Sequence, residues 1–134
     1  MIVLKKYWLS ILVISVILVL CFINPSEIPV EAPVKNFDKG VHFLMLGGLA
    51  GIIFFDNSFY FRRRVSGKSI FWGSLVFPIV FGGLIEIGQA DLTTTRTGDW
   101  VDFWADITGV VVAYLICLII NRRLPTTNVK TSGY

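Results

Sequence analysis

The chain has 134 residues, of which 54% are hydrophobic and 16% are charged, and its formal net charge is +3. Soluble domains carry about 25% charged residues, so this composition excludes an ordinary soluble protein and indicates one integral membrane domain. The basic residues lie between apolar runs and leave no basic, aromatic surface. This pattern excludes nucleic acid as a partner and makes the lipid bilayer the first one expected.

Four apolar runs are long enough to be membrane spans, because a helix needs about 20 residues to cross the hydrocarbon core. We predict helices at about residues 7–23, 38–58, 69–89 and 100–120, since a helix satisfies its backbone hydrogen bonds within one segment. The predicted fold is an all-α, integral membrane four-helix bundle formed by residues 1–123. Residues 124–134 are predicted to be a flexible cytoplasmic tail.

The first run also has the basic start and apolar core of a signal peptide. No A-x-A cleavage site follows it, and Leu20 is too bulky for the small residue that lipoprotein cleavage expects before Cys21. We therefore interpret this run as a retained transmembrane helix. In the resulting topology Cys21 and Cys117 lie near opposite membrane faces, too far apart for a disulfide.

The basic residues predict the orientation, because cytoplasmic loops carry an excess of Lys and Arg. Nine of the 12 basic residues fall on one side of the predicted spans: Lys5, Lys6, Arg62, Arg63, Arg64, Lys68, Arg122, Arg123 and Lys130. Both termini are therefore predicted to be cytoplasmic, and residues 24–37 and 90–99 to face outward. Almost all the acidic residues fall in the outer half, which the charge rule does not explain because acids contribute little to orientation.

Acidic side chains recur on one face of the fourth predicted helix. At about 100° per residue, Asp99, Asp102 and Asp106 fall within about 60° of one another. Asp102 and Asp106 are expected in the membrane zone, where a carboxylate has to face the bundle, a water-filled pocket or a partner. On the second and third helices the pairs Asp38–His42 and Glu86–Gln89 likewise share a face at the outer end.

Lys39 and Arg96 are the cations nearest to these outer stripes. One interpretation is that the acids pair with them and only hold the helices together. Two or three acids for each basic partner are more than that role needs, and crowded carboxylates raise one another's pKa values. The excess is therefore typical of a proton-carrying or cation-binding site.

Three motifs resemble the VanZ-like family of small bacterial membrane proteins: "DKGVHFLMLGGLA" from residue 38, "GGLIEIGQ" from residue 82 and "RTGDWVDFWADITG" from residue 96. The matching positions are Asp38, Lys39, His42, Phe43, Glu86, Gln89, Arg96, Gly98, Asp102 and Gly109. Two positions depart, because Asp99 stands where the family usually has Ser and Asp106 where it usually has Asn. Both departures add negative charge, so a different ligand or additional bound protons are expected here.

The resemblance implies a site at the extracytoplasmic face of the bacterial plasma membrane, and an envelope role. The family's founding member is linked to lowered teicoplanin susceptibility, so a similar effect is one expectation here. The predicted ligand-binding residues are Asp38, Lys39, His42, Glu86, Gln89, Arg96, Asp99, Asp102 and Asp106.

Our leading hypothesis is a site for a lipid-linked cell-wall molecule or a lipoglycopeptide. Arg96 would hold an anionic group by bidentate contacts, and Glu86, Asp102 and Asp106 would accept hydrogen bonds. His42, oriented by Asp38 or Glu86, would be the group that titrates near neutral pH.

The alternative is a membrane enzyme that acts on a lipid-linked envelope precursor. His42 would act as acid or base, oriented by Asp102 or Glu86, and these three are the catalytic candidates. A metal variant is conceivable, but no metal ligands or cofactor are assigned, because the chain has one His and no H-E-x-x-H motif. Proton or ion translocation is a third hypothesis, although the inner halves of the spans offer only Ser10, Ser15 and Ser74.

Overall fold

The computed structural model describes residues 2–22, 37–61, 64–92 and 100–125. Its elements in chain order are α1 (Ile2–Lys6), α2 (Trp8–Phe22), α3 (Phe37–Phe61), α4 (Gly67–Ile70), η2 (Phe71–Val76), α5 (Phe77–Leu92) and α6 (Trp100–Arg123). Within these ranges every element is a helix and none is a strand, which confirms the all-α prediction.

Three helical stretches are long and apolar enough to cross a membrane, namely Lys39–Phe59, Gly67–Asp91 and Trp100–Arg123. They correspond to the second, third and fourth predicted spans. The first predicted span corresponds to α2, a shorter apolar helix of 15 residues that a bend at Tyr7 separates from α1. The architecture is therefore a helical bundle of membrane type, with three long helices and one shorter apolar helix.

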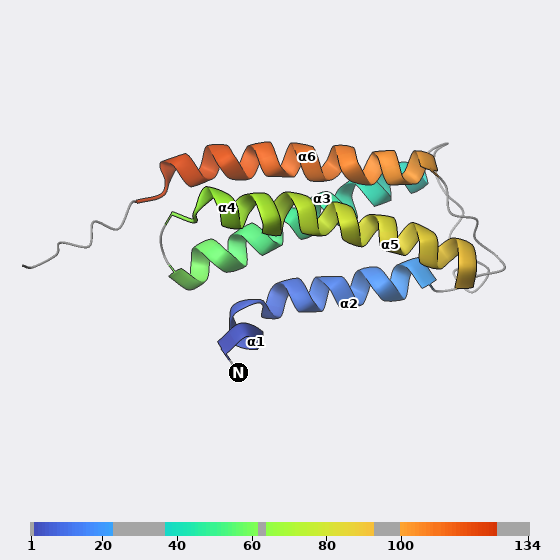
Figure 1. Ribbon diagram of the computed structural model, residues 1–134, viewed down its shortest axis with the longest axis horizontal. Helices are drawn as coiled ribbons and strands as arrows, with labels where there is room; N and C mark the ends of the chain where they lie inside the picture. The colour runs from blue at the N-terminus through green and yellow to red at the C-terminus, as the bar shows by residue number, and fades with distance from the viewer. Residues whose placement is uncertain (1, 23–36, 62–63, 93–99, 126–134) are drawn as a thin grey trace, which may run out of the picture.

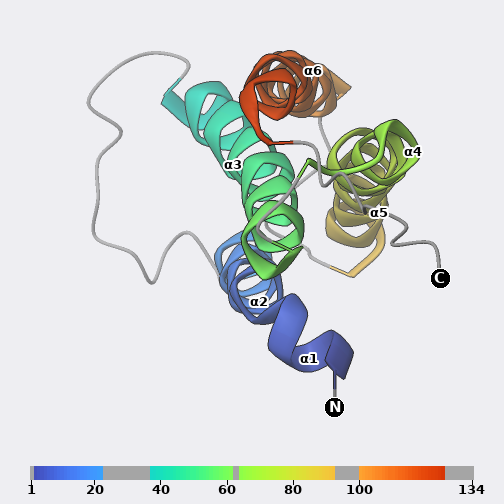
Figure 2. The same cartoon turned by 90° about the vertical axis from the view of Figure 1, so that its left-hand side faces the viewer.

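The long helices run in alternating directions along the bundle (Figure 1). Helices α3 and α6 are parallel and side by side, whereas α2 and the α4–η2–α5 helix run the opposite way. Seen along the bundle in Figure 2, α3 lies between α6 and α2 and also packs against α5. We call the end where α3 and α6 begin the site end, and the end where α1 begins and α6 finishes the opposite end.

The core lies along α3, where Leu46, Leu49 and Ala50 are fully buried. They pack with Ile17 of α2, Ile85 of α5 and Val110 of α6. The large apolar side chains on the outer surface, such as Leu84, Leu115 and Ile119, are exposed and suit contact with lipid tails. Cys21 and Cys117 are buried in different apolar clusters and form no disulfide with each other, as predicted.

Residues 67–92 form one helix that widens at the six residues of η2, which form a π-helix. The side chain of Ser66 caps its start by accepting a hydrogen bond from the Ser69 N–H, 3.2 Å away. The wide turn comes directly before the buried Pro78, which lacks an N–H and would crowd the carbonyl four residues earlier in a regular helix. The π-helix therefore fits the backbone around the proline, as π turns commonly do within α-helices.

Glycines bring the backbones of α3 and α6 into direct contact. A Cβ added at Gly47 would lie 2.8 Å from the carbonyl oxygen of Gly109, and one added at Gly109 would overlap the carbonyl oxygen of Phe43. Small residues at such contacts are the usual means of close helix packing in membranes. Gly47 and Gly51 have the spacing of a small-xxx-small motif, but only Gly47 of this pair makes the close contact, since a Cβ at Gly51 would meet nothing within 4 Å.

Gly47→Ala should therefore destabilise the bundle by about 1–3 kcal/mol, because the added methyl group overlaps backbone atoms that have little freedom to move. Gly48→Ala is the matched control, since its Cβ would meet nothing within 4 Å. The measurement is unfolding of the purified full chain in detergent, followed by circular dichroism. Equal effects of the two substitutions would show that α3 and α6 do not approach each other at Gly47.

Candidate functional site

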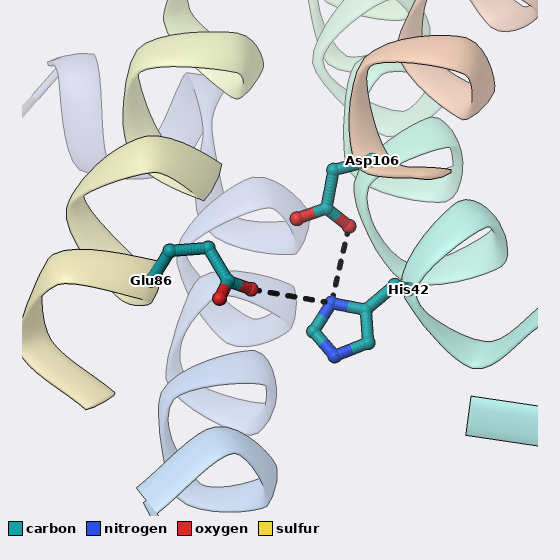
Figure 3. Close-up of side chains that lie close together, drawn as sticks. All are labelled: His42, Glu86 and Asp106. Carbon is teal, nitrogen blue, oxygen red and sulfur yellow. Dashed lines mark ion pairs between the residues drawn. The ribbon is translucent and has the colours of Figure 1, made fainter. Parts of the chain in front are cut away.

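Three helices bring His42, Glu86 and Asp106 together at the site end of the bundle. His42 comes from α3, Glu86 from α5 and Asp106 from α6, and both carboxylates point toward the same ring nitrogen (Figure 3). His42 Nδ1 lies 3.3 Å from Asp106 Oδ1 and 3.9 Å from Glu86 Oε1. A titratable ring and two carboxylates therefore converge in one place, which we call the His42 cluster.

The cluster is buried. His42 is 5% exposed and Asp106 only 1% exposed, and the side chain of Glu86 is 12% exposed. Neither carboxylate oxygen of Asp106 has a hydrogen-bond partner among the described residues. Burying a carboxylate without hydrogen bonds raises the free energy of the folded protein. A proton, a cation or a ligand is therefore expected to compensate the charge of Asp106.

A glycine of α5, Gly82, makes room for the Asp106 carboxylate. A Cβ added at Gly82 would lie 3.2 Å from Asp106 Oδ2 and 3.6 Å from Asp106 Cβ. Glu86 is four residues after Gly82, so the same face of α5 makes room for one carboxylate and presents the other. The sequence "GGLIEIGQ" therefore combines a packing glycine with a polar side chain one turn away.

A salt bridge lies one helical turn from the cluster. Lys39 Nζ is 2.9 Å from Asp102 Oδ1, and this pair joins the first turns of α3 and α6. The side chain of Asp102 is 11% exposed and that of Lys39 33% exposed. Because α3 and α6 run parallel, the pair and the His42–Asp106 contact follow each other along one seam, which continues to Gly47 and Gly109.

Gln89, one of the predicted ligand-binding residues, makes a contact between two helices. Its Nε2 donates a hydrogen bond of 2.8 Å to the backbone carbonyl of Cys21, near the end of α2. Gln89 is buried, and this bond ties α5 to the last turn of α2. Its position near Glu86 in sequence therefore reflects a helix contact as well as a shared face.

The remaining predicted residues are less fully described. Asp38 lies in the first turn of α3, and its side chain lies outside what the structure describes. Arg96 and Asp99 also lie outside the described residues. Of the partners predicted for His42, Glu86 is close and Asp102 pairs with Lys39, and among the described side chains Asp106 is the carboxylate nearest to His42.

A second polar group, not predicted from the sequence, lies near the opposite end. Asp56 is buried, and its Oδ2 accepts hydrogen bonds from the backbone N–H and the hydroxyl of Ser10, at 3.0 and 2.7 Å. The Tyr7 hydroxyl donates to Asn57 Oδ1 at 2.9 Å. In the sequence Asp56 is the one acid that does not fall in the outer half of the predicted spans. The polar pair Asp56-Asn57 within an apolar run is the signal that indicates a buried polar group here.

The opposite end also contains a cavity of about 470 Å³ between α2, α3 and η2. It is lined by Tyr7, Ser10, Asn57, Ser69, Trp72 and apolar neighbours. This cavity is far along the bundle from the His42 cluster, and its Tyr7 hydroxyl and Asn57 side chain bond each other. The His42 cluster, and not this cavity, is therefore the candidate functional site.

The Lys39–Asp102 pair should be energetically coupled, because each partner shields the other in a partly buried setting. In a double-mutant cycle with Lys39→Met and Asp102→Asn, we expect a coupling energy of about 1–2 kcal/mol in unfolding of the detergent-solubilised chain. The control cycle combines Lys39→Met with Asp91→Asn, which removes an exposed acid at the same end, and should be additive. Additivity in both cycles would contradict the salt bridge.

Comparison with known proteins tests the resemblance that the three motifs indicate. A family model described as VanZ/LLP1 matches residues 3–121 of the chain. Comparisons with curated proteins and with solved structures return no significant match. The matched range includes α3, α5 and α6 and therefore all three side chains of the His42 cluster. The resemblance inferred from the three motifs is confirmed, and the chain belongs to the VanZ/LLP1 family.

Proposed function

We propose that this VanZ/LLP1-family membrane protein binds a cell-envelope or lipid-linked ligand at its site end, on the extracytoplasmic side of the bacterial plasma membrane. The observation that carries the proposal is the His42 cluster, in which α3, α5 and α6 place a histidine against two carboxylates. Ionisable side chains within membrane spans mark functional sites by default. Asp106 supports this most directly, because it is almost fully buried and its oxygens have no hydrogen-bond partner among the described residues.

The orientation is supported by the distribution of charge along the bundle. The described basic residues of the opposite end are Lys5, Lys6, Arg64, Lys68, Arg122 and Arg123. Under the positive-inside rule this end faces the cytoplasm. The first residues of α1 and the last of α6 share this end (Figure 1), which supports the proposal that both termini are cytoplasmic and that the site end faces outward.

The two buried aspartates of α6 at the site end have different surroundings. Asp102 is accounted for by its salt bridge to Lys39, which joins two helices. Asp106 instead faces a histidine and a second carboxylate. Helix stitching by ion pairs therefore explains Asp102 and leaves the His42 cluster to be explained by a ligand.

The chemistry of the site end suits a ligand that carries both hydroxyl or amine groups and an anion. Glu86 and Asp102 have carboxylate oxygens that accept hydrogen bonds, and the partly exposed Lys39 offers a positive charge. Arg96, by its place in the third motif, is proposed to add a bidentate contact to a phosphate or carboxylate. Lipid-linked cell-wall precursors and the lipoglycopeptides that act on them fit this description.

An enzymatic function is the second candidate, and one distance favours it. Asp106 Oδ1 lies 3.3 Å from His42 Nδ1, so a carboxylate is in place to orient the ring for acid–base chemistry. The reaction would be hydrolysis or transfer on a lipid-linked envelope precursor. Turnover of such a precursor by the purified chain, lost in His42→Ala, would favour this candidate over binding alone.

The orientation can be tested by chemical labelling in intact cells. In a Cys21→Ser/Cys117→Ser background, Asp91→Cys should react with a membrane-impermeant maleimide from outside, whereas Lys68→Cys should react only after permeabilisation. Asp91 and Lys68 are exposed and lie at the two ends of the α4–η2–α5 helix, so they form a matched pair. Labelling of Lys68→Cys in intact cells would reverse the proposed orientation.

The ligand hypothesis predicts a change in teicoplanin susceptibility of cells that lack their own copy of the protein. Wild type and the control Asp91→Asn should lower susceptibility equally. His42→Ala and Glu86→Gln should return it to the level of cells without the protein, because both disrupt the His42 cluster. Membrane levels are quantified in the same cultures, and Arg96→Ala tests the proposed anion contact.

The lipoglycopeptide part of the proposal would be wrong if wild type had no effect on susceptibility. If every variant that lost the effect were also lost from the membrane, the His42 cluster would be a folding determinant instead of a ligand site.

A further inference from the structure

The His42 cluster has the spacing of a metal-ligand set. One ligand atom each from His42, Glu86 and Asp106 can be chosen so that all three lie within 4.8 Å of one another. A tetrahedral Zn²⁺ with bonds of about 2.0–2.2 Å separates its ligand atoms by about 3.3–3.5 Å. The 3.3 Å between His42 Nδ1 and Asp106 Oδ1 already fits this value, and the 3.9 Å to Glu86 Oε1 would have to shorten by a few tenths of an ångström.

The charges of the cluster favour a divalent cation. Two carboxylates and a neutral imidazole carry two negative charges, which one divalent ion would neutralise completely. Lys39, the described cation at this end, is already bonded to Asp102. Because charges at membrane depth are tolerated when they are paired or coordinated, a bound cation would account for two acids in one buried place.

The unsatisfied carboxylate provides an independent observation. Asp106 is 1% exposed and points into the cluster (Figure 3), and neither of its oxygens has a hydrogen-bond partner among the described residues. The oxygens of Asp106 and the ring nitrogen of His42 converge at 3.3 Å, which is the arrangement that coordination of a metal ion requires.

We propose that His42, Glu86 and Asp106 bind a divalent transition-metal ion, with Zn²⁺ as the favoured occupant. One imidazole and two carboxylates form a mixed nitrogen and oxygen set that suits Zn²⁺ better than Mg²⁺, which demands an octahedral shell of oxygens. Three protein ligands leave a coordination position open, and an anionic oxygen of the proposed ligand would occupy it. This inference rests on the proposed function and adds the ion that receives the anion at the same site.

The test uses the full chain, purified in detergent, stripped with a chelator and dialysed against Zn²⁺. We expect one tightly bound Zn²⁺ per chain by elemental analysis. Asp106→Asn should weaken Zn²⁺ binding by more than the roughly tenfold cost of losing an outer-shell partner. Asp91→Asn is the matched control, because it makes the same change at an exposed acid of the same end, and it should bind Zn²⁺ like wild type.

A spectroscopic measurement keeps the proposal testable if a variant fails to fold. Co²⁺ substituted into the wild-type chain should show the strong visible absorption of a tetrahedral site, and Zn²⁺ should displace it. The absence of saturable binding, a weak octahedral spectrum typical of an adventitious ion, or equal losses in Asp91→Asn and Asp106→Asn would overturn the proposal.

The two proposals fail separately. An effect on teicoplanin susceptibility without Zn²⁺ binding would overturn the metal site alone and leave the ligand site standing. Zn²⁺ binding at one ion per chain without any effect on susceptibility would support the metal site and count against the lipoglycopeptide.

Discussion

The close contact between the backbones of α3 and α6 determines the geometry of the site. Where Gly47 and Gly109 meet, neither helix can carry a side chain. This contact fixes how far the two parallel helices are offset along their axes. His42 therefore lies opposite Asp106, and Lys39 lies opposite Asp102. A shift of one turn between the helices would place either Lys39 opposite Asp106 or His42 opposite Asp102, depending on its direction.

Much of the architecture could be predicted from the sequence, because a bilayer imposes length and composition directly. The apolar runs gave the positions of the long helices, and the 100° rotation per residue placed Asp102 and Asp106 on one face. The first predicted span, residues 7–23, corresponds to α2, although composition alone does not reveal the bend at Tyr7 that separates it from α1. That bend coincides with the hydrogen bond from Tyr7 to Asn57, a contact between residues 50 positions apart in sequence.

The detailed pairing in the site could not be predicted, for a physical reason. Asp102 and Asp106 share a helix face, so periodicity leaves either of them free to approach His42. Which of the two carboxylates approaches His42 depends on the offset between α3 and α6 along their axes. The contact between Gly47 and Gly109 sets this offset, and no local sequence pattern predicts it. Gln89 is a similar case, because its bond to the backbone of Cys21 depends on where α2 ends. Asp56 was not recognised because its partner, Ser10, is on another helix.

The π-helix before Pro78 affects the site at a distance. A π turn takes up one more residue than an α turn, so it rotates everything after it by about 100° around the helix axis. Gly82 and Glu86 both follow this turn, and their common direction toward α6 includes that rotation. The direction in which Glu86 points from α5 therefore depends on the π-helix Phe71–Val76, which ends more than two turns before it. Changes there that restored a regular α-helix would turn Glu86 away from His42 without altering any residue of the cluster.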